Sequence, residues 1–128
     1  MKEPEWVLRE TVSMLHEQSL AQFGGSAGVR DEGLLDSALG KPQNLFAYGK
    51  PTIFDLAASY AFGLVKNHPF IDGNKRAGFI TALTFLELNG YQFHATEVDA
   101  AVRTLALAAG EMSEAAYAEW LRANSKRA

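Results

Sequence analysis

Apolar residues recur at helical spacing along most of the chain, and no segment alternates between apolar and polar positions as a half-buried strand does. This pattern predicts six helices, over residues 4–22, 31–39, 52–66, 74–88, 96–109 and 113–124. Residues 91–93 are expected to form a short extended link. The predicted fold class is therefore all-α, with about six helices.

Residues typical of helix ends bound these segments. The candidate N-caps are Asp31, Thr52, Thr96 and Ser113. Thr52 and Asp55 resemble a capping box in which Asp replaces Glu. Gly40 and Pro42 are expected to end the second helix, which leaves residues 41–51 as a loop. Because this loop carries Leu45, Phe46 and Tyr48, it is expected either to pack against the core or to form a binding flap.

Length and composition indicate one ordinary compact domain over residues 1–128. A chain of this size buries about two-thirds of its surface on folding. Hydrophobic residues make up 48% of the sequence and charged residues 21%, which argues against disorder. The helix over residues 74–88 carries no charge between Arg76 and Glu87. A helix that is apolar on all sides is expected in the middle of the domain.

The distribution of charge limits the classes of partner. The formal net charge of −3 excludes the broad basic field expected of a protein that binds nucleic acid or an anionic membrane. The most apolar stretch, residues 56–86, is interrupted by polar residues and is not expected to span a membrane. Its own charges sum to +2, so the rest of the chain carries −5. One small cationic site is better suited to a single bound nucleotide than to a polyanion.

The absence of cysteine excludes disulfides, thiol catalysis and cysteine-based zinc sites. The first ten residues are too charged for the apolar core of a signal peptide. A cytoplasmic location is therefore expected.

The connection between the third and fourth predicted helices concentrates polar groups beside two apolar segments. In order it holds His68, Pro69, Phe70, Ile71, Asp72, Gly73, Asn74, Lys75 and Arg76. A buried polar group without a partner costs about 1–3 kcal/mol, so a loop next to the core should not collect such groups without a cause. We therefore expect a functional site in this loop.

The helix that starts after Gly73 is expected to bind an anion. The first N–H groups of a helix lack partners within the helix, and the helix dipole favours negative charge beside them, so phosphate is the natural ligand. Gly73 permits a close approach of the backbone. Asn74, Lys75 and Arg76 add an amide donor, a point charge and a bidentate guanidinium.

Asp72 and His68 complete the predicted site. Asp72 is a candidate ligand for Mg²⁺, which usually takes one or two carboxylates together with phosphate oxygens. His68 is the candidate general base, because an imidazole titrates near neutral pH and can accept the proton of an attacking hydroxyl.

Structural roles are open for some of the same residues. Asp72 could cap the following helix, while Lys75 and Arg76 could form local ion pairs. His16 and His94 are expected on the surface. The three histidines of the chain lack the spacing of metal ligands, so no structural metal is expected.

Residues 68–76 meet every defined position of the pattern His-x-Phe-x-(Asp/Glu)-Gly-Asn-(Gly/Lys)-Arg. In this the sequence resembles the Fic/Doc superfamily. Residues 28–35, 57–67 and 85–90 resemble its death-on-curing (Doc) branch, so the likeness covers nearly the whole chain. The resemblance implies an α-helical fold, use of an Mg²⁺–nucleotide complex, and transfer of part of the nucleotide to a protein hydroxyl.

By this resemblance His68 matches the general base and Asp72 the acidic residue that serves the metal. The residues that match the phosphate-binding turn are Gly73, Asn74 and Arg76. Lys75 stands where the adenylylating members have Gly, and Phe79 where they have a second Arg. In Doc-like members these departures accompany kinase activity, which favours transfer of the γ-phosphate of ATP to a threonine of elongation factor Tu. The alternatives are AMP transfer to a protein hydroxyl and a catalytically silent binding module.

The resemblance also implies a toxin that is held silent by a partner. Doc-type toxins are paired with an antitoxin whose disordered tail folds as a helix against the toxin. Autoinhibited Fic proteins instead carry the pattern Ser/Thr-x-x-x-Glu-Gly/Asn within their own chain. Here Gln18 follows Ser13 and Glu17, which breaks that pattern. Control by an antitoxin protein is therefore expected.

Overall fold

The computed structural model describes all 128 residues, which form six helices and one small sheet. The helices are α1 (Arg9–Phe23), α2 (Glu32–Tyr48), α3 (Ile53–Asn67), α4 (Asn74–Leu88), α5 (Glu97–Ala109) and α6 (Glu114–Ala123). The strands are β1 (Tyr91–Phe93) and β2 (Ser125–Arg127). The predicted all-α fold of about six helices is confirmed.

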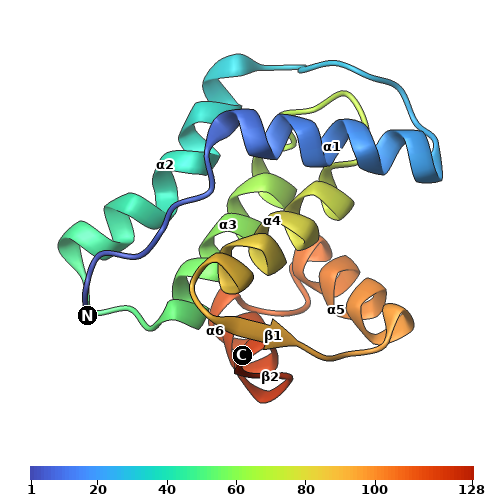
Figure 1. Ribbon diagram of the computed structural model, residues 1–128. Coiled ribbons are helices and arrows are strands. Elements are labelled where there is room, and N and C mark those ends of the chain that lie inside the picture. The colour runs from blue at the N-terminus through green and yellow to red at the C-terminus, as the bar shows by residue number, and fades with distance from the viewer.

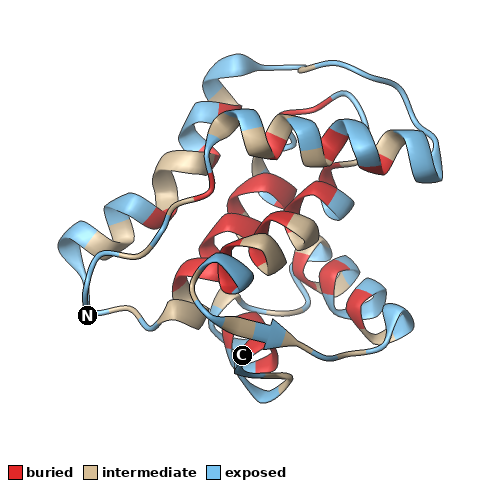
Figure 2. Ribbon diagram, in the orientation of Figure 1, coloured by how far each residue is buried: buried red, intermediate tan, exposed pale blue.

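Helices α3 and α4 pack side by side in the centre of the domain, as Figure 1 shows. Helix α1 lies against one end of α4, α2 covers one side of α3, and α5 and α6 lie on the other side. Buried residues gather on the two central helices (Figure 2). The uncharged part of α4 has no exposed residue between positions 77 and 86, as expected, and α3 is buried more continuously still.

Two glycines let the central helices approach their neighbours closely. A Cβ atom on Gly78 of α4 would lie 3.1 Å from the carbonyl oxygen of Ala61 in α3. A Cβ atom on Gly63 of α3 would lie 3.2 Å from the Cα atom of Ala38 in α2. Close packing of α3 on both sides fixes the two ends of the loop that follows it.

The predicted helix caps are present. Asp31 accepts a hydrogen bond from the N–H of Leu34 at 2.9 Å, and the Thr52 and Asp55 side chains form the expected capping box. Thr96 and Ser113 cap α5 and α6 in the same way. These caps explain why four helix starts could be placed from sequence.

The first helix starts later than predicted, at Arg9 rather than near Pro4. The segment before it is extended because tertiary contacts use its backbone and side chains. The N–H of Val7 donates to the buried hydroxyl of Tyr60 at 3.0 Å. The ring of Trp6 stacks on Phe85, with 5.9 Å between centroids.

The second helix was predicted to end at Gly40 and Pro42, and this is wrong. Helix α2 continues through both residues to Tyr48, so only residues 49–52 remain as a loop and residues 41–48 do not form a flap. The apolar positions of α2 that face the core keep helical spacing across the proline: Leu35, Ala38, Pro42 and Leu45. Packing of this face offsets the hydrogen bond that a proline removes from a helix.

The extended link after α4 proved to be a strand with a partner. Strand β1 pairs antiparallel with β2 at the end of the described chain, with Tyr91 opposite Arg127 and Phe93 opposite Ser125. Strands of three residues are too short to show a two-residue period, which explains why the sheet was missed.

Removing the hydroxyl of Tyr60 tests the packing of the N-terminal segment. Burial raises the pKa of this phenol to about 12, so the hydroxyl is neutral when it accepts the Val7 N–H. We expect Tyr60→Phe to lower the free energy of unfolding by about 1–3 kcal/mol, because a buried N–H loses its acceptor. Urea unfolding measures the loss.

Tyr48→Phe is the matched control, because this tyrosine is 91% exposed. Its effect should stay within about 0.5 kcal/mol. Equal stability of the two variants would contradict the role given to Tyr60.

Candidate anion-binding site between the central helices

The loop between α3 and α4 buries its apolar residues and exposes its polar ones. Pro69 and Phe70 are buried, whereas His68 and Asp72 are exposed. The chain leaves α3 through His68 in the left-handed region, with φ 52° and ψ 52°, and enters α4 through Gly73 with φ 78°. Two left-handed residues therefore bracket a tight reversal of the chain.

The segment just before α2 holds the first half of this loop. The N–H groups of Arg30 and Asp31 both donate to the carbonyl oxygen of Pro69, at 2.7 and 3.1 Å. The N–H of Ile71 donates to the carbonyl oxygen of Gly28 at 3.1 Å. This pairing resembles a short antiparallel ladder and fixes the backbone next to His68.

The guanidinium of Arg30 caps the end of α3 from the same segment. Its Nε atom donates to the carbonyl oxygen of His68 at 2.8 Å, and its Nη2 atom donates to that of Asn67 at 3.0 Å. A cation at a helix C-terminus is favourable because the last carbonyl groups have no partner within the helix. The imidazole of His68 makes no hydrogen bond in the structure and stays free at the surface.

Asn74 holds the second half of the loop. Its side chain is buried; Oδ1 accepts from the N–H of Phe70 at 2.9 Å, and Nδ2 donates to the carbonyl oxygen of Phe70 at 3.0 Å. The sequence suggested that this amide would donate to an anion. In the structure both its ends are engaged within the loop, so only the backbone N–H of Asn74 is free for a ligand.

The start of α4 leaves three backbone donors without a protein acceptor. They belong to the consecutive residues Asn74, Lys75 and Arg76. The next N–H, of Ala77, already donates to the carbonyl oxygen of Gly73 at 3.0 Å. Three adjacent free N–H groups at the positive end of a helix dipole can bind a phosphate.

The two cations beside these donors are not paired with any acid. Lys75 and Arg76 are exposed and form none of the salt bridges in the structure, so the alternative of local ion pairs is wrong. The guanidinium of Arg76 lies over the ring of Phe23, 4.8 Å from its centroid, and 3.5 Å from the carbonyl oxygen of Gly24. Both cations remain available to a negatively charged ligand.

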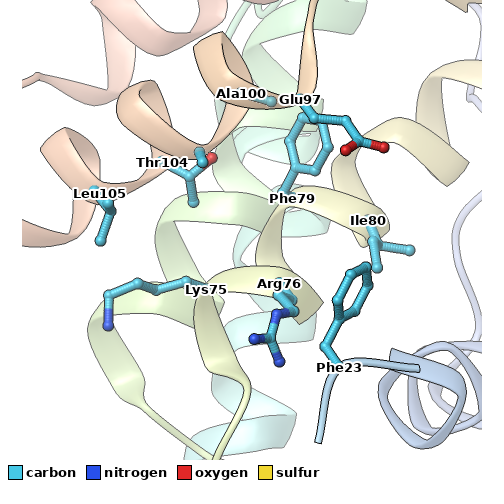
Figure 3. A pocket seen from close by; sticks show the side chains of 10 residues that line it. Phe23, Lys75, Arg76, Phe79, Ile80, Glu97, Ala100, Thr104 and Leu105 are labelled. Carbon is cyan, nitrogen blue, oxygen red and sulfur yellow. The ribbon is translucent and has the colours of Figure 1, made fainter. Parts of the chain in front are cut away.

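A groove of about 500 Å³ begins at these cations and runs between α4 and α5. Figure 3 shows Lys75 and Arg76 on one side of it and the carboxylate of Glu97 on the opposite side. Its apolar lining includes Phe23, Phe79, Ile80 and Leu105. The sequence did not point to this groove, because Phe23 at the end of α1 lies far along the chain from the residues of α4 and α5 that form the rest of its walls.

The carboxylate of Asp72 is exposed and only partly engaged. Oδ1 accepts from the N–H of Gly73 at 2.9 Å and Oδ2 from the N–H of Ser26 at 3.3 Å. Gly73 is itself the N-cap residue of α4 and no side chain caps that helix, so the alternative that Asp72 is the cap is wrong.

The structure contains no group of three or more acidic or histidine side chains that could enclose a metal ion. One carboxylate with free lone pairs next to phosphate donors does fit Mg²⁺, which takes most of its other ligands from phosphate and water. A complete protein cage is not needed for that ion.

His16 is the site residue that sequence reasoning missed. It was expected on the surface, but it is 3% exposed, its Nε2 atom lies 2.7 Å from the carbonyl oxygen of Asp72, and its ring stacks on Phe70 at 3.8 Å between centroids. A signal was available, since Val12, His16 and Ser19 are spaced as one face of a helix and form the buried face of α1. His94 is exposed, as expected.

The fold and the loop define an all-α domain whose two central helices are joined by a turn with an exposed histidine, an exposed carboxylate and three free N–H groups at the start of α4. A family model described as the Fic/DOC family matches residues 6–86. The chain belongs to this family, as the resemblance of the loop suggested.

Two curated relatives place the chain near the Doc branch. It is 45% identical over 94 residues to a protein named Toxin Doc from Mycolicibacterium smegmatis, covering 71% of this chain and 69% of the relative. It is 35% identical over 115 residues to one named Protein kinase doc from Escherichia phage P1, covering 88% of this chain and 90% of the relative. None of the helices is sufficiently long and apolar to cross a bilayer.

Replacing the amide of Asn74 by a carboxylate tests how the loop is held. We expect Asn74→Asp to lower the free energy of unfolding by about 1–3 kcal/mol, because the carbonyl oxygen of Phe70 loses its donor and faces another acceptor. Chemical denaturation at neutral pH measures this.

Asn44→Asp makes the same change at an exposed position of α2 and should alter stability by less than about 0.5 kcal/mol. A loss at Asn74 no greater than that at Asn44 would show that the amide does not hold the loop.

Proposed function

We propose that this protein is a Doc-type toxin of a toxin–antitoxin system that acts as a protein kinase in the cytoplasm. It transfers the γ-phosphate of ATP to a serine or threonine hydroxyl of a translation factor, such as elongation factor Tu, and so blocks translation. Membership of the Fic/Doc family and likeness to relatives named Toxin Doc and Protein kinase doc support this proposal. The observation that carries it is the start of α4, where three free N–H groups adjoin two unpaired cations.

In this proposal some loop residues bind the phosphates of ATP and His68 transfers a proton. The N–H groups that follow Gly73, together with Lys75 and Arg76, hold the phosphates. His68 accepts the proton of the target hydroxyl as the hydroxyl oxygen attacks the γ-phosphorus and ADP leaves. The imidazole is free for this role because it makes no hydrogen bond within the protein.

ATP would supply the phosphoryl group, and Mg²⁺ bound with it would neutralise part of the charge on the phosphates. Asp72 would be the protein's ligand to the metal. Asn74 contributes its backbone N–H and holds the loop.

The residue at position 79 supports phosphate transfer over AMP transfer. Phe79 stands where the resemblance places a second arginine in adenylylating members. Its ring packs within an aromatic cluster, 5.8 Å from Phe93 and 6.3 Å from Trp120 between centroids, and it lines the groove. The chain therefore offers one guanidinium and one ammonium at the phosphates instead of two guanidinium groups, which changes where the phosphates can lie.

The antitoxin is proposed to act through the groove between α4 and α5. Its disordered tail would fold as a helix there, with apolar residues against Ile80 and Leu105. A tail bound in this place would cover the cations at the groove's end and keep ATP from the loop.

Transfer of label from ATP tests the proposed reaction. Purified protein is incubated with Mg²⁺, elongation factor Tu and ATP that carries ³²P at either the γ or the α position. We expect label in the factor from the γ position only, and none with His68→Ala, because that variant has no general base. Label from the α position would show that the protein is an AMP transferase and not a kinase.

His94→Ala is the matched control, since this histidine is exposed and only its backbone N–H makes a hydrogen bond. It should label the factor as the unmodified protein does. Expression in cells gives the second readout: growth should stop with the unmodified chain and continue with His68→Ala. Absence of labelling together with normal growth for both would favour the silent binding module.

A further inference from the structure

His16 touches the loop at the residues that precede the free N–H groups of α4. Its Nε2 atom lies 2.7 Å from the carbonyl oxygen of Asp72, and its ring stacks on Phe70. A Cβ atom placed on Gly73 would lie 3.4 Å from the same Nε2 atom. One side chain from α1 therefore contacts Asp72 and Phe70 and leaves little room for a side chain at position 73.

The chemistry of this hydrogen bond fixes which nitrogen carries a proton. A carbonyl oxygen only accepts, so Nε2 must be the donor, in the neutral and in the charged imidazole alike. The bond to Asp72 therefore does not depend on the ionisation of His16. Its role is to hold the backbone in place.

No other group holds the carbonyl oxygen of Asp72. The segment before α2 bonds to Pro69 and Ile71, and Asn74 bonds to Phe70. The peptide unit that joins Asp72 to Gly73 is the part of the loop that can turn most easily, because glycine adopts positive and negative φ at similar cost. Its N–H is bound by the carboxylate of Asp72 itself, so His16 is its only anchor outside the loop.

Packing alone does not account for a histidine at this position. The buried face of α1 needs volume, which an apolar residue would supply without burying a polar ring. The ring instead donates its N–H to the carbonyl oxygen of the peptide that joins Asp72 to Gly73, the N-cap residue of α4.

We infer that His16 is a positioning residue of the phosphoryl-transfer site: it locks the Asp72–Gly73 peptide so that the carboxylate and the free N–H groups face the ligand together. The chemistry it serves is that of the proposed function, on which this inference rests.

Two substitutions separate the hydrogen bond from the packing. His16→Phe keeps an aromatic ring against Phe70 but has no N–H to donate. His16→Gln loses the ring but places an amide N–H at a similar distance along the side chain. The exposed His94, changed to Phe and to Gln, gives the matched controls.

Three quantities are measured for each variant: the midpoint of thermal unfolding, the hydrogen-exchange rate of the Gly73 amide, and the kcat and KM for transfer of γ-phosphate to elongation factor Tu. We expect His16→Phe to remain folded, to exchange the Gly73 amide faster, and to lose about tenfold to a hundredfold in kcat with little change in KM for the protein substrate. His16→Gln should recover most of both losses.

Wild-type exchange and kcat in folded His16→Phe would overturn the inference. So would equal losses in His16→Phe and His16→Gln that follow their unfolding midpoints, because that result marks a structural role. Should the unmodified protein transfer no phosphate, the proposed function fails by itself. The Gly73 exchange rates then still decide whether His16 holds the loop, since they need no ligand.

Discussion

The side-chain amide of Asn74 forms hydrogen bonds with both the N–H and the carbonyl oxygen of Phe70, and the rest of the site depends on these two bonds. It closes a short connection between two buried helices while satisfying backbone groups that cannot reach water. Because Phe70 is held in the core, the backbone is also held in place at His68 and Asp72, the exposed residues on either side of it. The amide thus converts a tight turn into a rigid platform for polar side chains.

The platform is supported from three directions by elements that are distant in sequence. Helix α1 contributes His16, the segment before α2 contributes Arg30 and its neighbours, and the close packing of α3 on α4 sets the two ends. The central helices therefore provide rigidity, and the N-terminal part of the chain sets the direction of the loop.

Much of the fold and of the site was predictable from local patterns, and the failures share one cause. Caps at Thr52 and Ser113, and the loop of polar residues at the start of α4, act over a few residues and can be read directly. The continuation of α2 through Pro42 and the burial of His16 depend on what lies opposite them in space. Tertiary packing outweighed the tendency of a proline to end a helix and of a lone histidine to lie on the surface. The groove between α4 and α5 was not predicted for the same reason.

In the proposed function, backbone N–H groups at the start of α4 bind the phosphates of a nucleotide. The ¹H–¹⁵N spectrum of the protein, followed during titration with Mg²⁺ and a non-hydrolysable ATP analogue, tests this binding. We predict that the amide signals of Asn74, Lys75 and Arg76 shift the most and saturate together. If the analogue binds and these three signals do not move, the phosphates are bound elsewhere on the protein.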